Sequence, residues 1–217
     1  MKTMTMKTTN EAPMKRTRAL CLVALLSLGL LATSCGGGGN PIVIGGLIAL
    51  FVPDAASADP RISMEAGPAA GDVFTVEIHS NAIDEVAGVA FTLLYDDTLA
   101  TYLGCEASGS IFLSNPGLTN PCDNTVVGGA RFNAELQNGT PGLLNVGASL
   151  EGLVAGVAGG TGLVLTLTFQ AQADAAAPGT PYQFEAGPSR EVQTCDLVSC
   201  VPAAVNWDEG ALVATST

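Results

Sequence analysis

Adjacent acidic residues come nearest to a catalytic arrangement in this chain. They form three pairs: Asp84-Glu85, Asp96-Asp97 and Asp208-Glu209. A glycosidase needs two carboxyl groups that face each other across a cleft, whereas each of these pairs stands at a predicted turn, where acidic side chains are common. The single histidine, His79, would need distant partners to complete a Ser-His-Asp set. The sequence therefore predicts a protein that is not an enzyme.

Metal ligands are present, but they are not spaced as in known sites. Asp96, Asp97, Asp123 and Asn124 carry the oxygen ligands that calcium prefers, yet the spacing of a calcium loop is absent. Zinc sites combine several cysteines and histidines at short spacing, and no Cys-x-x-Cys pair exists here. We expect no metal and no cofactor.

The first 35 residues have the layout of a secretory signal. In residues 14–35, a basic stretch precedes an apolar run from 19 to 32 and a small-residue site that ends at Cys35. The apolar run is shorter than the roughly 20 residues of a comfortable membrane span. A short uncleaved membrane anchor is the alternative, and Met14 is an alternative start. We predict that the protein is exported.

The end of this segment, Leu31-Ala32-Thr33-Ser34-Cys35, resembles the lipobox of bacterial lipoproteins. The resemblance implies cleavage before Cys35, which then carries diacylglycerol and an N-acyl chain. Two or more acyl chains anchor a protein stably to a membrane. We therefore expect residues 1–35 to be a lipoprotein signal peptide, and the mature protein to be lipid-anchored in the cell envelope, at the outer membrane or the cell surface.

Removal of residues 1–35 leaves a strongly acidic chain. Arg61, Arg131 and Arg190 remain together with nineteen acidic residues, which gives a formal net charge of −16. Electrostatic repulsion then disfavours nucleic acid and anionic lipid as partners. The charge favours solubility and also attracts cations or a basic partner.

Four cysteines remain after the signal and the lipidation site: Cys105, Cys122, Cys195 and Cys200. An even number of cysteines in an exported chain predicts two disulfides. Three pairings are possible. The local pairing, Cys105 with Cys122 and Cys195 with Cys200, requires the least loop closure, and we predict it.

Residues 36–60 are expected to be a tether that begins with four glycines and contains a short apolar segment. That segment, residues 42–52, is too short to span a bilayer as a helix. Two interpretations are open. The segment adds a strand to the edge of the domain, or it lies near the membrane beside the lipid.

Residues 61–217 are predicted to form one all-β domain. Short alternating segments are separated by Gly, Pro, Asn and Asp, and no amphipathic helix is visible. The central one is residues 86–95, followed by a turn at Asp96-Asp97-Thr98. About nine or ten strands are expected, at residues 62–66, 72–79, 86–95, 99–105, 111–113, 131–137, 143–150, 163–170, 182–186 and 211–215. This pattern indicates a β-sandwich or jelly roll.

The order of several motifs resembles the cohesin domain, over residues 61–215. Gly71-Asp72 stands before the second strand, Tyr95 and Asp96 form a turn followed by Leu99, and Gly162 precedes a strand that contains Phe169. The resemblance implies a nine-stranded jelly roll of the cohesin type, related to bacterial cellulose-binding domains. It also implies that one flat sheet face binds a dockerin, which is a small calcium-loaded helical module.

The same resemblance identifies candidate residues for that face. In the strand at residues 88–95, the outward positions include Thr92 and Leu94. A neighbouring strand contributes Arg131, Asn133 and Glu135. We therefore predict a non-enzymatic envelope lipoprotein that presents a cohesin-like protein-binding module to a dockerin-like protein.

Two alternatives stay open. A carbohydrate-binding module that recognises a polysaccharide would need exposed aromatic rings, for which Trp207, Tyr102 and Tyr182 are the candidates. A structural envelope lipoprotein would need no soluble ligand.

Overall fold

The computed structural model describes residues 46–115, 117–152 and 154–217. The predicted signal peptide, the lipidation site Cys35 and the first part of the predicted tether lie outside these residues. Within them, the chain forms β-strands and one short 3-10 helix, η1 (Gln137–Gly139). No helix in the described ranges is long and apolar enough to cross a membrane.

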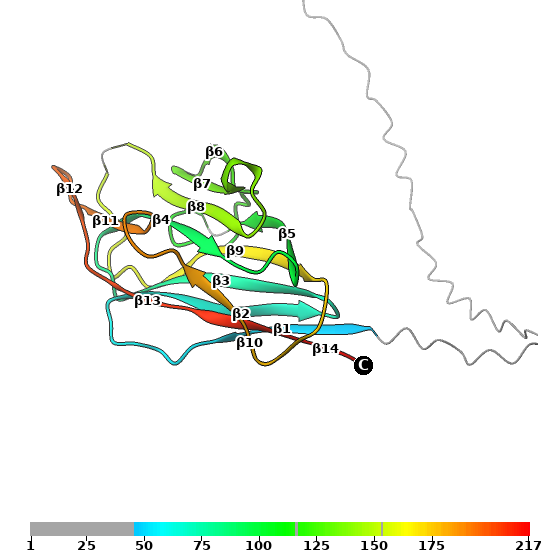
Figure 1. Ribbon diagram of the computed structural model, residues 1–217. Coiled ribbons are helices and arrows are strands. Elements are labelled where there is room, and N and C mark those ends of the chain that lie inside the picture. The colour runs from blue at the N-terminus through cyan, green and yellow to red at the C-terminus, as the bar shows by residue number, and fades with distance from the viewer. Residues whose placement is uncertain (1–45, 116, 153) are drawn as a thin grey trace, which may run out of the picture. The chain divides into compact units, whose positions relative to one another are not determined.

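Two sheets pack against each other (Figure 1). The nine-stranded sheet runs β1-β14-β10-β4-β8-β7-β6, and β11 pairs with both β4 and β12. Its strands are β1 (Leu47–Pro53), β4 (Val86–Leu94), β6 (Asp123–Val127), β7 (Ala130–Leu136), β8 (Leu143–Leu150), β10 (Ala175–Phe184), β11 (Glu191–Cys195), β12 (Cys200–Pro202) and β14 (Gly210–Ser216).

The five-stranded sheet runs β13-β2-β3-β9-β5. Its strands are β2 (Arg61–Ala70), β3 (Val73–Asn81), β5 (Ala100–Glu106), β9 (Gly162–Ala171) and β13 (Asn206–Asp208). Every strand pair is antiparallel except β13 with β2. The predicted all-β jelly-roll sandwich is thereby confirmed.

Alternating side chains build the core between the sheets. In β3, Phe74, Val76 and Ile78 are fully buried, while the residues between them face outward. Tyr182 lies at the centre, with its ring centroid 5.1 Å from that of Phe169 and 5.8 Å from that of Tyr95. Contacts between such large rings dominate core energetics.

The turn motifs have direct physical roles. Gly71 joins β2 to β3 with a positive φ of 64°, a conformation that glycine adopts without a steric cost. Asp72 then accepts a hydrogen bond from Gln170 Nε2 at 2.7 Å, which ties the turn to β9. At the predicted turn after β4, Asp96 Oδ1 accepts bonds from the backbone N and the hydroxyl of Thr98.

Residues 47–53, within the predicted tether, form β1 of the larger sheet. The strand pairs with β14 from Leu47↔Ser216 to Pro53↔Gly210. Ala49 and Phe51 are buried in the core. Of the two interpretations of this apolar segment, the structure supports the added strand, and the folded domain therefore begins before residue 61.

Two differences from the expected strands have local causes. Residues 111–113 do not form a strand: Phe112 and Leu113 are buried, but backbone bonds such as that from Leu113 N to Ser110 O close turns instead. The structure also holds fourteen strands in its described part rather than nine or ten. The additional strands are short or at the edges: β1, β6, β11, β12 and β13.

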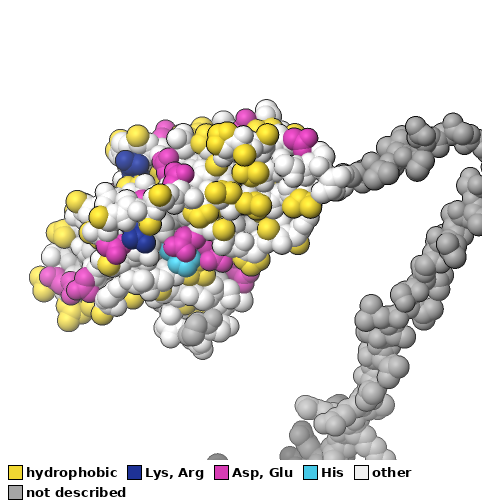
Figure 2. All heavy atoms as spheres, turned by 90° about the horizontal axis from the view of Figure 1, so that it is seen from below, with side chains coloured by type: hydrophobic (Ala, Val, Ile, Leu, Met, Phe, Trp, Pro, Cys, Tyr) yellow, Lys and Arg dark blue, Asp and Glu magenta, His cyan; other side chains and the backbone are white. Residues whose placement is uncertain are grey.

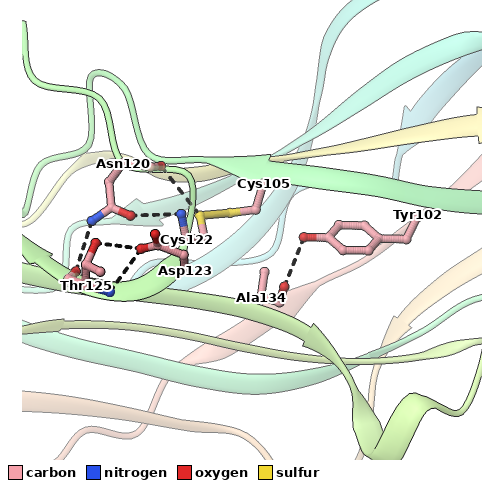
Figure 3. The surroundings of a disulfide bond; sticks show 7 residues. All are labelled: Tyr102, Cys105, Asn120, Cys122, Asp123, Thr125 and Ala134. Atoms are coloured by element: carbon pink, nitrogen blue, oxygen red, sulfur yellow. Dashed lines mark hydrogen bonds between the residues drawn. A yellow bond between two sulfur atoms is a disulfide. The ribbon is translucent and has the colours of Figure 1, made fainter.

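Both predicted disulfides are present. Cys105 in β5 is bonded to Cys122, directly before β6, so this bond joins the edge strands of the two sheets. Figure 3 shows how buried Asn120 holds the segment: its Oδ1 accepts a bond from Cys122 N at 2.8 Å, and its Nδ2 donates to Thr125 O. The second disulfide, Cys195–Cys200, closes the β11–β12 hairpin.

Candidate functional site

A shallow trough runs across the outer face of the larger sheet, over β11, β4, β8 and β7. Two rows of residues cross it in register. One row is Gln193, Gly88, Ser149 and Arg131, and the other is Glu191, Ala90, Gly147 and Asn133. The hollow has a volume of about 280 Å³. We call this region the trough.

Small residues form the floor of the trough. Gly88, Ala90 and Gly147 lie side by side on β4 and β8. A Cβ atom built on Gly147 would meet no atom within 4 Å, and one on Gly88 would make only ordinary contacts. Neither glycine is therefore required by close packing, and their effect is to leave open space above the sheet.

The rim of the trough is polar, and its side chains are held in place. Arg131 Nε donates to Glu151 Oε1 at 2.5 Å, and Arg131 Nη1 donates to the backbone oxygen of Asn124. On the opposite rim, Gln193 Nε2 donates to Glu191 Oε1 at 3.1 Å. These bonds present fixed donors and acceptors on both sides of a flat floor, an arrangement suited to polar contacts with a protein surface.

The five predicted face residues separate into three groups. Arg131 and Asn133 line the trough. Glu135 is exposed further along β7. Thr92 is only 4% exposed and donates its hydroxyl to Asn145 Oδ1, and Leu94 is half-buried at the end of β4 beside β10.

Sequence reasoning missed the β11 side of the trough. Glu191 and Gln193 belong to a strand of five residues whose Val192 and Cys195 are buried. The alternation of polar and apolar residues over Glu191, Val192 and Gln193 was the available signal. It is short, and nothing in the sequence indicates that this segment pairs with β4.

The hairpin that follows β11 ends in an exposed apolar tip. Leu197 and Val198 are 72% and 82% exposed. Asp196 Oδ1 accepts bonds from the backbone N of Val198 and Ser199, both at 2.7 Å. These bonds lower the pKa of the Asp196 carboxyl, the backbone bond from Ser199 most strongly. Together with Cys195–Cys200, they fix the tip next to the trough.

No aromatic side chain is free to act as a flat platform for a sugar. All eleven Phe, Tyr and Trp residues are buried or half-buried in the described ranges. Tyr182 is fully buried, and Tyr102 donates its hydroxyl to Ala134 O (Figure 3). Trp207 packs against Phe184 and lies under the guanidinium of Arg190.

Acidic side chains in the described ranges do not gather with His or Cys into a group that could hold a metal ion. The three acidic pairs lie apart. Glu209 Oε1 accepts a bond from Phe184 N, and Asp84 Oδ1 accepts one from Gly159 N. These carboxylates hold loops and strand ends in place.

The comparisons with known proteins agree with this architecture. The family described as Cohesin domain matches residues 62–205. No curated protein sequence matches the chain significantly.

Among solved structures, the second type II cohesin module from the adaptor ScaA scaffoldin of Acetivibrio cellulolyticus has a TM-score of 0.53 at 14% identity, covering 72% of this chain and 91% of that chain. A type I cohesin–dockerin complex from Clostridium thermocellum has a TM-score of 0.48 at 15% identity, covering 75% and 96%. Since the family match spans more than half of the sequence, the chain belongs to the cohesin family.

Proposed function

We propose that this protein is a lipid-anchored cohesin module of the cell envelope, which binds a dockerin-bearing protein over the trough. Cohesin modules are non-enzymatic protein-interaction domains, and the family implies a dockerin as the class of partner. The observation that carries the proposal is the trough itself. It combines an open floor of small residues with fixed polar groups on both rims.

The charge of the trough defines the partner further. Arg131 is the one basic residue of its rim, while Glu191, Glu135 and Glu151 lie on the same face or directly beside it. The mature chain also carries a predicted net charge of −16. We therefore expect the contacting surface of the partner to be basic, with association that slows as salt increases.

Filling the trough tests the proposal. Gly147→Val adds a side chain above the floor where space is open, in a strand that accepts β-branched residues. The matched control is Gly104→Val in β5, at the edge of the other sheet, where a Cβ also meets nothing within 4 Å. Binding of calcium-loaded dockerins encoded in the same genome would be measured by biolayer interferometry.

We expect Gly147→Val to lose binding at least ten-fold and Gly104→Val to bind as the parent does. Equal binding by the two variants would place the partner elsewhere on the domain. Failure of the parent protein to bind any of these dockerins would contradict the proposed function itself.

Anchoring at Cys35 has its own test, since this residue lies outside the described ranges. In the Cys35→Ala variant, no thioether to diacylglycerol can form, and we expect the protein to move from the membrane fraction to the soluble fraction. Metabolic labelling with a fatty acid should mark the parent and not the variant. A Cys35→Ala protein that stays in the membrane fraction would favour an uncleaved anchor.

A further inference from the structure

The inward face of strand β1 is buried in the core, whereas its outward face is apolar but exposed. Ala49 and Phe51 point into the core and are 1% and 2% exposed, whereas Ile48, Leu50 and Val52 point outward and are 51%, 45% and 40% exposed. Outward positions on a strand at the edge of a sheet are normally polar or charged, because an exposed apolar edge invites association. The outward apolar side chains of β1 are therefore unusual, and they indicate that another surface covers them.

The apolar surface continues onto the neighbouring strands. In register, Leu50 lies beside Val213 and Val52 beside Ala211 of β14, and Ala211 lies beside Pro181 of β10. Figure 2 views the domain from the side of β1 and β14 and shows hydrophobic side chains gathered there. We call this surface the β1 face; it comprises Ile48, Leu50, Val52, Pro181, Ala211 and Val213.

The β1 face is free of charge in a strongly charged chain. None of the residues in β1, β14 and β10 is Asp, Glu, Lys or Arg. The predicted net charge of −16 is therefore carried elsewhere. An uncharged, apolar surface of this kind is the part of the molecule that can contact lipid at the lowest cost in free energy.

The position of β1 in the chain indicates which occupant it meets. Leu47, the first residue of β1, follows Cys35 by twelve positions, a stretch that reaches at most about 40 Å when fully extended. Acyl chains on Cys35 would hold β1 at high effective concentration near the bilayer. Only a few apolar side chains are then needed for contact, since the anchor already supplies the affinity.

A second copy of the chain fits this face less well. Pairing of two copies would bring together two domains that each carry a predicted charge of −16. Six small to medium side chains also fall short of the roughly 800 Å² per partner that a stable protein interface buries.

We propose that the β1 face rests on the membrane that holds the lipid of Cys35, with Ile48, Leu50 and Val52 inserted among the lipid headgroups. This inference rests on the lipid anchor of the proposed function. Strands β6 to β8 lie at the other end of the sheet from β1 (Figure 1). Contact through β1 would leave the trough half of the same sheet outside the contact and open to a partner.

Fluorescence quenching by brominated lipid tests the contact. The full chain would be expressed with its own signal, purified as the lipidated protein, and reconstituted into phosphatidylethanolamine–phosphatidylglycerol vesicles with or without dibrominated phosphatidylcholine. Leu50→Trp places a reporter on the β1 face. Val126→Trp is the matched control, since Val126 is an exposed strand residue (48%) on β6 at the opposite end of the sheet.

Brominated lipid should quench Leu50→Trp at least two-fold more than Val126→Trp, after subtraction of the signal of the native Trp207. Equal quenching of the two variants in protein that floats with the vesicles would overturn this inference and leave the anchor intact. Parent protein that does not float with the vesicles would overturn both the anchor and the contact.

Discussion

The two halves of the larger sheet share one core and differ completely on their outer sides. In β1, β14 and β10, the outward residues carry no charge, and in β1 they are the apolar Ile48, Leu50 and Val52. In β11, β4, β8 and β7, the outward residues that line the trough are small or polar. The halves join between β10 and β4 through only two residue pairs, Gln183↔Leu94 and Phe184↔Leu93. The difference teaches that packing determines the inner side of each strand, whereas the outer side is free to serve different contacts.

Among the substitutions considered, loss of the β1 residue Phe51 should have the largest effect on stability. Its buried ring lies 5.8 Å from that of Tyr182 and attaches β1 to the core. Phe51→Ala should lower the free energy of unfolding by about 3–5 kcal/mol. Leu50→Ala, on the outer side of the same strand, should cost less than about 1 kcal/mol. Urea denaturation measures both, and equal losses would contradict the division into inner and outer sides.

Removal of the disulfides should have the next largest effects. The bond between Cys105 and Cys122, with a sequence separation of 17, joins the two sheets. Its replacement by two serines should cost about 3 kcal/mol on loop-closure grounds, against about 2 kcal/mol for Cys195–Cys200, which has a separation of 5.

The variant in which Cys195 and Cys200 are both replaced by serine separates an effect on stability from an effect on partner binding. Because Cys195–Cys200 lies beside the trough, its loss should weaken partner binding more than the loss of Cys105–Cys122. Thermal unfolding of both double variants tests the predicted ranking of stability losses. Dockerin binding by the same two variants tests the predicted ranking of binding losses. If the variant without Cys105–Cys122 were more stable than the variant without Cys195–Cys200, the predicted ranking of stability losses would be wrong.

Alkaline titration should show whether the junction between the two halves is closed to water. The chain has three tyrosines, and burial raises the pKa of each: Tyr102 to about 12, with Tyr95 and Tyr182 also raised. Tyr95 and Tyr182 are stacked at the junction, with ring centroids 5.8 Å apart. Unfolded tyrosines ionise near pH 10.

The direction of the pH effect follows from these raised pKa values. The stability that the neutral tyrosines contribute is complete below about pH 10 and is lost as the pH rises from there through about 12, because only the unfolded chain ionises freely at first. The ultraviolet absorbance of tyrosinate should therefore appear together with unfolding. Ionisation of Tyr95 or Tyr182 near pH 10 in the folded protein would show that water reaches the junction.

The smallest change in stability is expected at the trough. Arg131 and Glu151 are each more than one-third exposed, and exposed ion pairs contribute little. Arg131→Gln should change the free energy of unfolding by less than about 0.5 kcal/mol while it weakens dockerin binding. If Arg131→Gln lowered stability as much as Phe51→Ala does, the main role of Arg131 would be to stabilise the sheet and not to bind the partner.

The sequence predicted the elements whose signals are local. Alternation located β3, β4 and β9, and chain distance predicted both disulfides. For β1, the sequence alone could not tell which side chains face the core and which face outward. An apolar run such as LIALFVP looks uniform when both its faces are apolar, and only the pairing with β14 separates them.

The candidate face was predicted in part, for a related reason. Arg131 and Asn133 were found because β7 alternates clearly. The burial of Thr92 depends on Asn145 from β8 and on the segment after β10, whose Glu185 donates a bond to Thr92 O. Contacts of this kind join segments more than 50 residues apart, and single-strand patterns carry no record of them.

The order of strands bears on when the larger sheet can close during folding. In the sheet, β1 has only β14 as a neighbour, and Leu47 meets Ser216. Strand β1 thus cannot pair until β14, which lies far away in the sequence, is available, and such long-range pairing is slow. If the chain is exported as proposed, the larger sheet cannot close at β1 until β14 has also been translocated, so the domain cannot finish folding part-way through the passage.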